Sequence, residues 1–186
     1  FKDVVVHGIV RDSQGRKMSK SLGNGIDPIE IIDKYGADAL RFSVLSGTTM
    51  GNDIRYMPEK LEQASNFANK IWNAAKFIIM NTPDEEKVKK FHDDWYNNGT
   101  SKYNQELLTI EDKWILNKLD KLVVDITRNI ENYDLGIALD KIYNFIWNEF
   151  CDWYIEMVKT RIFSENEETK VAVSDILNYV FGTSLK

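Results

Sequence analysis

The sequence predicts a mainly α-helical protein in which a short α/β segment precedes a bundle of at least three long antiparallel helices. Three long segments, residues 58–80, 110–131 and 135–161, repeat apolar side chains every three or four positions, which is the spacing of one helix face. Residues 4–10 are instead rich in β-branched side chains, which favour a strand. Short links between the later helical segments predict antiparallel neighbours.

The first part of the chain is predicted to hold one short strand, a loop and two short helices. The strand at 4–10 is followed by a turn at 12–15, where Asp, Ser and Gly favour chain reversal. Asp27 is the expected N-cap of a helix over residues 28–35, because a proline occupies the first helical position after it. A second short helix is expected over residues 37–45.

Proline and capping residues mark the ends of the long helices. Pro58 lies at the start of the first long helix, and Pro83 closes it. Thr109 is the expected N-cap of the second helix, with Asp112 in a capping-box position, and Asp134 is the expected N-cap of the third. The residues expected to face the core are Leu61, Ala64, Ala68, Ile71, Ala75 and Ile78; then Ile115, Leu119, Leu122, Val123, Ile126 and Ile130; then Leu135, Leu139, Ile142, Ile146, Phe150, Trp153 and Met157.

Two further segments complete the chain. Residues 81–106 are polar, and we expect a long connection that can contain one further helical piece. A last helix is expected from Ser164 to the end of the chain, where the apolar pattern of residues 173–181 is still running without a glycine cap. The chain also has no initiator Met. The sequence therefore predicts an internal piece of a longer protein, truncated at its C-terminus.

Composition excludes several classes of protein. Apolar residues make up 43% and aromatic residues 12% of the 186, which supports a packed core rather than a disordered chain. No apolar run approaches the roughly 18 residues that span a bilayer, and the first residues do not form a signal peptide. A single cysteine, Cys151, is typical of a reducing cytoplasm. With His7 and His92 as the two histidines, we expect no metal site.

Charge is distributed unevenly along the chain. The net charge is −5, with 24 basic and 29 acidic residues. Residues 1–80 carry 11 basic and 9 acidic side chains, a net of +2, which leaves 13 basic and 20 acidic side chains, a net of −7, for residues 81–186. A polyanion should therefore prefer the first part of the chain or a local face of the second.

Residues 17–21, with the sequence Lys-Met-Ser-Lys-Ser, indicate chemistry on phosphate. They lie between Gly15 and Gly23 and bring together two ammonium groups and two hydroxyl groups. When ATP is attacked at its α-phosphorus, negative charge grows on the departing pyrophosphate, and lysines placed there stabilise the transition state. A loop flanked by glycines can close over a nucleotide and open again for release.

This loop resembles the signature of the class I aminoacyl-tRNA synthetases. Other stretches resemble the valine, isoleucine and leucine branch of that family, and the later ones resemble its valine-specific members most. These stretches are His-Gly-Ile-Val-Arg-Asp at 7–12, Gly-Arg at 15–16, Leu-Gly-Asn at 22–24, Asp-Pro at 27–28, Tyr-Gly-Ala-Asp-Ala-Leu-Arg at 35–41, Gly-Asn-Asp-Ile-Arg at 51–55, Asn-Phe-Ala-Asn-Lys-Ile-Trp-Asn-Ala at 66–74, Asp-Lys-Trp-Ile-Leu at 112–116 and Phe-Cys-Asp-Trp-Tyr-Ile-Glu at 150–156.

The resemblance implies a ligase that activates valine with ATP and Mg²⁺ and attaches it to tRNA(Val). Residues 1–50 would be the end of the nucleotide-binding catalytic domain, including the stem-contact segment, and residues 51–186 a helical anticodon-binding domain. ATP would be a substrate rather than a permanently bound cofactor. The resemblance assigns catalytic roles to Lys17 and Lys20, and it assigns ATP binding to Lys17, Met18, Ser19 and Lys20. The protein would be cytoplasmic, a monomer, and without a membrane partner.

Five polar residues are candidates for tRNA contact, and the alternative for each is a solvated surface residue. They are Arg55, Asn66, Asn69, Lys70 and Asn73. Four tryptophans in the helical part, Trp72, Trp114, Trp147 and Trp153, are expected mostly to be core or half-buried packing residues rather than platforms for base stacking. Cys151 is expected to be a small buried apolar residue.

Other interpretations remain open at this point. The same region of an isoleucine or leucine enzyme is one, and a non-catalytic helical RNA-binding module or a plain helical interaction protein is another. The family's second ATP signature, His-x-Gly-His, does not occur in these residues, because His7-Gly8 is followed by Ile9. We therefore expect no adenylation activity from this piece alone.

Overall fold

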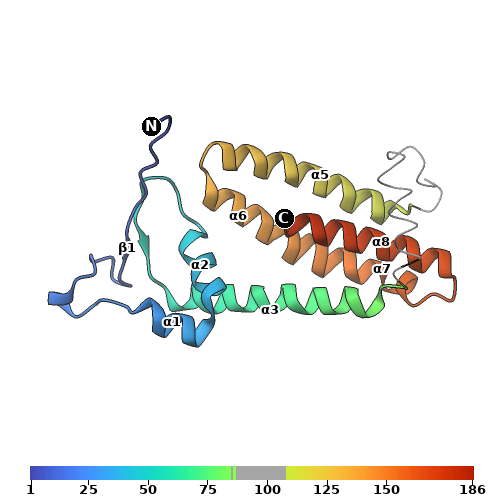
Figure 1. Cartoon of the computed structure of the whole chain (residues 1–186), viewed down its shortest axis with the longest axis horizontal. Helices are drawn as coiled ribbons and strands as arrows, with labels where there is room; N and C mark the ends of the chain where they lie inside the picture. The colour runs from blue at the N-terminus through green and yellow to red at the C-terminus, as the bar shows by residue number, and fades with distance from the viewer. Residues whose placement is uncertain (85, 87–107) are drawn as a thin grey trace. The chain divides into compact units, whose positions relative to one another are not determined.

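The computed structural model describes residues 1–84, 86 and 108–186 (Figure 1). Most of the connection predicted at 81–106 lies outside these residues. Contacts divide the chain into two compact units, each built from two stretches of sequence. Unit 1 comprises residues 1–70 and 124–143, and unit 2 comprises residues 71–123 and 144–186. This division by compactness does not test the domain boundary near residue 50, which stays a prediction.

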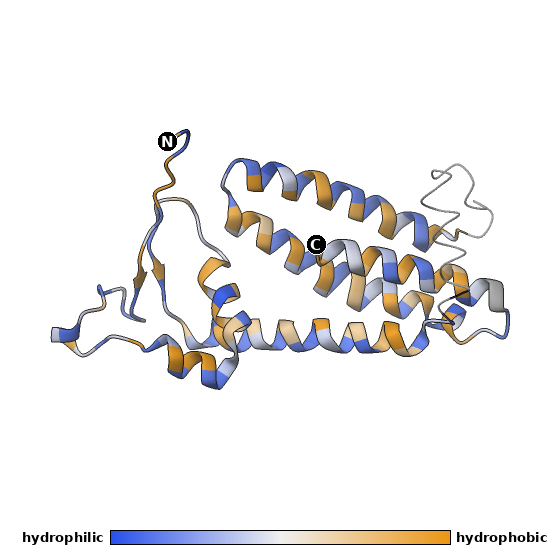
Figure 2. Ribbon diagram, viewed as in Figure 1, coloured by the Kyte–Doolittle hydropathy of each residue, from blue (hydrophilic) through white to orange (hydrophobic). Residues whose placement is uncertain are grey.

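Helices make up most of the described structure, which confirms the predicted fold class. Beyond residue 57, the helical elements in the described ranges include α3 (Pro58–Asn81), α5 (Ile110–Glu131), α6 (Leu135–Asn144), the π-helical segment η2 (Phe145–Tyr154), α7 (Ile155–Ile162) and α8 (Glu167–Ser184). Figure 2 shows apolar and polar residues alternating in short stretches along α3 and α5, as a helix with one buried side requires. None of the described helices combines the length and apolarity that a bilayer crossing requires.

Unit 1 contains a two-stranded parallel sheet. Strand β1 (Val10–Arg11) pairs with β2 (Ile54–Arg55), with Val10 opposite Ile54 and Arg11 opposite Arg55. The predicted strand at 4–10 is therefore wrong for residues 4–9, which form no strand. A strand needs a hydrogen-bonded neighbour, and β2 offers a neighbour only two residues long.

Two short helices connect the strands. Helix α1 (Pro28–Tyr35) begins after Asp27, whose side chain accepts a 2.8 Å hydrogen bond from the backbone N–H of Ile29. Helix α2 (Ala37–Leu45) follows across a single glycine, as predicted. Both helices pack against each other within unit 1.

The buried side of α3 differs in part from the prediction. Leu61, Ala64 and Ile78 are buried as expected, but Ala68 is exposed and Phe67 is buried in its place. Both positions satisfy helical spacing, so the pattern alone does not choose between them. Phe67 is the buried residue because its ring packs against other aromatic rings of unit 1. Its centroid lies 5.2 Å from that of Phe42 and 4.7 Å from that of Tyr143.

The prediction for α5 holds along the centre of its apolar stripe and fails at the edges. Ile115, Leu119 and Leu122 are buried, whereas Val123 and Ile130 are exposed. Val123 follows Leu122 directly and so lies about 100° further around the helix. The capping-box position of Asp112 is confirmed, because its Oδ2 accepts a 3.0 Å hydrogen bond from the backbone N–H of Thr109.

The third long helix is continuous but changes its geometry in the middle. The prediction placed Trp153 and Met157 in the core, and both are exposed, as is Leu135. The buried residues instead recur every four positions, at Ile146, Phe150, Tyr154, Val158 and Ile162. An α-helix advances 3.6 residues per turn, so a spacing of four would drift around it. Ile146, Phe150 and Tyr154 lie in η2, whose wider i→i+5 turns change which side chains face the core, and Val158 and Ile162 follow on α7.

Unit 2 also contains α8, which packs beside α7 (Figure 1). Its N-cap is Asn166, whose side chain accepts a hydrogen bond from Thr169 N at 3.2 Å, so the predicted start at Ser164 lies before the helix. Ring stacking joins α8 to η2: the centroids of Phe150 and Phe181 are 5.6 Å apart. The core of unit 2 is therefore largely aliphatic and aromatic.

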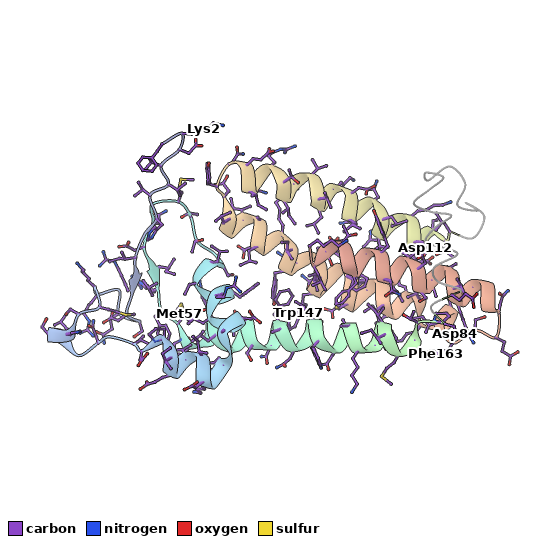
Figure 3. All side chains as sticks on the ribbon, in the orientation of Figure 1. Lys2, Met57, Asp84, Asp112, Trp147 and Phe163 are labelled. Atoms are coloured by element: carbon purple, nitrogen blue, oxygen red, sulfur yellow. The ribbon has the colours of Figure 1, made fainter. Side chains whose placement is uncertain are left out.

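Two carboxylates are buried within that core, those of Asp112 and Asp175. Asp112, in the first turn of α5, is completely buried (Figure 3). Tyr154 donates to its Oδ1 at 2.7 Å, and Nη1 of Arg161 donates to Oδ1 and Oδ2 at 2.8 and 2.7 Å. The charge is thus paired and fully hydrogen-bonded, as a buried carboxylate requires.

Candidate functional site

The loop at residues 17–21 is anchored by Asp12, which is 6% exposed. Oδ1 of Asp12 accepts hydrogen bonds from the backbone N–H groups of Gln14 and Arg16, at 3.0 and 2.7 Å. Its Oδ2 accepts from Nε of Arg16 at 2.8 Å. The carboxylate thus closes the turn at 12–15 that the sequence predicts, and the backbone agrees, because Gly15 N donates to Asp12 O at 2.9 Å.

Asn24 holds the far end of the loop to this turn. Its Nδ2 donates to Oδ2 of Asp12 at 2.9 Å and to the carbonyl of Lys17 at 3.2 Å. Its Oδ1 accepts from the backbone N–H of Ser19 at 2.9 Å. One amide side chain therefore uses both its donor and its acceptor to fix the backbone of the loop.

The second half of the loop is a short 3-10 helix, η1 (Lys20–Leu22), capped by Ser19. Oγ of Ser19 accepts from Leu22 N at 3.3 Å and lies 3.1 Å from Oγ of Ser21. Gly23 ends the turn in the left-handed conformation, at φ 59°, which favours glycine. Ser19 therefore has a local structural role in addition to the predicted one.

The two lysine side chains of the loop are exposed, unlike the side chains of Asp12 and Asn24 that hold its backbone. Lys17 and Lys20 are exposed, and Met18 is half-buried. Within the described part of the chain, neither ammonium group forms an ion pair or hydrogen bond. An ordered backbone with two outward ammonium groups is suited to binding a polyphosphate.

The anchoring carboxylate has a shifted acidity. The hydrogen bond from Asn24 contributes most to lowering the pKa of Asp12 from 3.8 to about 2, burial opposes the shift, and the N–H groups of Arg16 add to it. Each of these donors stabilises the ionised carboxylate. Asp12 therefore stays ionised at neutral pH and acts as an anchor rather than as a proton donor.

The candidate tRNA contacts fall in two places. Arg55 lies on β2, is exposed, and lies against Gly15: a Cβ added at that glycine would lie 3.1 Å from Nε of Arg55. The other four lie on α3, where Asn66, Asn69 and Asn73 are exposed and Lys70 is half-buried. The structure therefore places Arg55 against the turn that precedes the loop, and the other four candidates on one helix.

Two predictions about large or sulfur-containing side chains need correction. Trp72 and Trp153 are 72% and 62% exposed, so the expectation of core or half-buried packing is wrong for both, whereas Trp114 and Trp147 are half-buried as expected. Cys151 is half-buried rather than buried. Trp72 lies on α3 among the exposed asparagines, so its indole is available on that helix.

Sequence reasoning missed the roles of Asp12 and Asn24. Both residue types commonly bond their side chains to nearby backbone, and they flank the loop. That signal was present, since an Asp and an Asn bracket a short segment between glycines. Their mutual contact, over 12 residues, is set by the fold of the loop and cannot be obtained from spacing.

Comparison with protein families assigns the two ends of the chain. A family model described as tRNA synthetases class I (I, L, M and V) matches residues 1–57. A second, described as the anticodon-binding domain of tRNA ligase, matches residues 112–186. The chain therefore belongs to the class I tRNA synthetases.

Within this class, the chain is homologous to the valine--tRNA ligases over its whole length. It is 50% identical over 186 residues to valine--tRNA ligase of Clostridium perfringens and 47% identical over 190 aligned positions to that of Bacillus cereus. Each alignment covers 100% of this chain and 20% of the relative. The chain thus spans about a fifth of the length of these curated relatives.

Solved structures share the fold at low sequence identity. Methionyl-tRNA synthetase of Mycobacterium tuberculosis, in complex with methionyl-adenylate, aligns with a TM-score of 0.65 at 20% identity, over 96% of this chain and 33% of that one. The ternary LeuRS-tRNA-LeuAMS complex of Agrobacterium radiobacter K84 aligns with a TM-score of 0.62 at 19% identity, over 95% of this chain and 20% of that one. At these identities the likeness concerns the fold alone.

Proposed function

We propose that this chain is the part of a valine--tRNA ligase that binds the phosphates of ATP and contacts the anticodon arm of tRNA(Val). The observation that carries the proposal is the loop at 17–21, whose backbone is tied down by Asn24 and Asp12 while Lys17 and Lys20 stay exposed. Homology to valine--tRNA ligases over the whole chain supports the assignment to valine.

The catalytic role rests on charge stabilisation. Valine attacks the α-phosphorus of ATP, with Mg²⁺ bound to the nucleotide, and valyl-adenylate and pyrophosphate form. Lys20 and Lys17 stabilise the negative charge that grows on the departing pyrophosphate, and Met18 and Ser19 lie beside the nucleotide. The His-x-Gly-His signature does not occur in these 186 residues, and the pocket for the amino acid is expected outside them. The proposed reaction therefore needs a longer polypeptide.

The tRNA role rests on the exposed polar side of α3. Asn66, Asn69 and Asn73 offer amide donors and acceptors to unpaired bases, and Lys70 offers a charge to the backbone. Trp72 adds an exposed indole on which a base can stack. We further propose that the protein works as a monomer in the cytoplasm. The cytoplasmic location is supported by the single Cys151, because few cysteines are typical of a reducing compartment.

A chimera tests the catalytic proposal. The equivalent stretch of the Clostridium perfringens enzyme is replaced by this chain, and valine-dependent exchange of pyrophosphate into ATP is measured. Lys20→Ala should lower exchange by about 100-fold or more without weakening tRNA binding. Lys113→Ala removes an equivalent exposed charge from α5 and should leave exchange unchanged. Unchanged exchange in the Lys20 variant would remove this lysine from the mechanism.

The tRNA proposal is tested on the chain itself. Binding is measured to a tRNA with a valine anticodon and to one with an isoleucine anticodon, at two salt concentrations. A preference for the valine tRNA that Asn73→Ala reduces, and that Asn117→Ala on α5 does not, supports base reading by α3. Equal and steeply salt-dependent binding to both tRNAs would leave only contact with the phosphate backbone.

A further inference from the structure

Two guanidinium groups converge on the turn that precedes the loop. Nη1 of Arg11 donates to the carbonyl of Gly15 at 3.5 Å. The Arg55 guanidinium approaches the same residue, since a Cβ added at Gly15 would lie 3.1 Å from its Nε and 3.4 Å from its Nη2. Gly15 itself has φ +80°, a conformation that favours glycine. The missing side chain at this position leaves room for Arg55 to lie over the turn.

Backbone pairing places three basic residues in one row. Arg55 is the register partner of Arg11 in the parallel pair β1–β2. On its other side Arg11 forms an isolated antiparallel bridge with Lys17, the first residue of the loop. Residues directly opposite each other in paired strands project to the same face. Lys17, Arg11 and Arg55 therefore form a row that begins in the loop and ends on β2.

The three charges in this row are not equally neutralised. Arg11 pairs with Asp53, with Nε 2.5 Å from Oδ2, and the other nearby carboxylate, Asp12, is occupied by Arg16. In the described ranges, no carboxylate forms an ion pair with Lys17 or Arg55. Two positive charges thus flank a neutral pair on one face. An anion bound across them would relieve their mutual repulsion.

We propose that Arg55 binds the triphosphate chain of the nucleotide together with Lys17 and Lys20, rather than the anticodon arm. The planar guanidinium presents paired N–H donors that match two phosphate oxygens, which a lysine does not. The inference rests on the proposed function, because it adds a residue to the same phosphate-binding loop. It moves Arg55 from the set of tRNA contacts to the nucleotide site, on the evidence of its packing against Gly15.

Inorganic tripolyphosphate is the probe, because it has the phosphate chain without a nucleoside. Its affinity for the chain is measured by isothermal titration calorimetry at low salt. Arg55→Ala should weaken binding by about tenfold or more, the size expected for a lost charge-assisted contact. Arg55→Lys should have an affinity between those of the unsubstituted chain and Arg55→Ala, because lysine keeps the positive charge but lacks the paired N–H donors of the guanidinium. Arg41→Ala is the matched control: this arginine on α2 is exposed and pairs with Asp38 at 3.5 Å.

The outcomes separate this inference from the proposed function. Loss of affinity in Arg55→Ala, with Arg41→Ala unchanged, supports the inference. Wild-type affinity in Arg55→Ala overturns it, and a simultaneous loss in Lys20→Ala would then leave the loop's own role intact. Absence of tripolyphosphate binding by the unsubstituted chain also overturns it, whereas the exchange assay in the chimera still decides the role of Lys20. Circular dichroism of each variant shows that the comparison is made between folded chains.

Discussion

Nδ2 of Asn24 donates a 2.9 Å hydrogen bond to Oδ2 of Asp12, and this contact joins the two ends of the loop that bears Lys17 and Lys20. The same amide also bonds the backbone at Lys17 and Ser19. The loop is therefore held by its flanks, while its lysine side chains remain exposed. Such an arrangement orients the ammonium groups without using them for structure.

Asn24→Ala should loosen the loop. The substitution removes three hydrogen bonds, and each is worth about 1 kcal/mol. Amide hydrogen exchange of residues 17–24 should accelerate by about tenfold or more, while exchange in α5 stays as it was. Asn69→Ala, an equivalent change at an exposed position on α3, should have no effect on the loop. Unaltered exchange at residues 17–24 in the Asn24 variant would show that the amide is not what holds them.

Acid should release the same loop. The pKa of Asp12 is lowered to about 2 from 3.8, so in the unfolded chain this carboxyl takes up a proton at a higher pH than in the folded one. Its contribution to stability is therefore fully present above about pH 4 and is lost as the pH falls towards 2. A carbon-13 titration of the Asp12 carboxyl should give a midpoint near 2. In Asn24→Ala the midpoint should rise, because the largest cause of the shift is removed; a wild-type midpoint near 3.8 would contradict the assignment.

The buried pair in unit 2 should dominate local stability. Arg161→Met leaves the charge of Asp112 buried without its cation and should lower the free energy of unfolding by about 3–5 kcal/mol. Tyr154→Phe removes one donor to the same carboxylate and should cost about 1.5–3 kcal/mol. Lys159→Ala breaks an exposed pair with Glu156 and should cost less than about 1 kcal/mol. Urea unfolding gives the change in the free energy of unfolding for all three variants. Equal losses in Arg161→Met and Lys159→Ala would contradict the claim that the buried pair stabilises the fold more than the exposed one.

Two glycines in helices should respond to alanine in opposite directions. At Gly136 in α6 an added Cβ would lie 2.2 Å from the carbonyl oxygen of Thr48, so backbone must move and the variant should be destabilised. At Gly182 in α8 nothing lies within 4 Å, so alanine should stabilise the helix by about 0.5–1 kcal/mol. Thermal unfolding of both variants tests this difference. Stabilisation by Gly136→Ala would show that the close approach to Thr48 is easily relieved.

Local signals in the sequence predicted several elements well because their causes are local. Asp27 and the proline after it define the start of α1, and Thr109 with Asp112 defines the start of α5. Residue type and spacing likewise singled out the lysines of the loop, and the family resemblance supplied their roles. Both lysines are exposed, and their contact with a nucleotide remains a prediction.

Errors arose where the partner of an element decides the outcome. Residues 4–9 have strand composition, but β2 pairs only with Val10 and Arg11. Trp153 has the right spacing for the core of a regular α-helix, yet the π-helical turns of η2 bury Tyr154 instead. Neither the length of a neighbouring strand nor a change in helical pitch appears in the periodicity of one segment.

The sequence by itself determined the helical architecture, the starts of α1 and α5 and the Lys-Met-Ser-Lys-Ser loop, since each depends on residues within a few positions of one another. Only the tertiary structure decided that Asn24 bonds to Asp12, that Arg161 pairs with Asp112, and that Arg55 lies against Gly15. These contacts join residues 12, 49 and 40 positions apart, and their geometry depends on the packing of the elements that carry them. Packing is a property of the folded chain, and no local propensity encodes it.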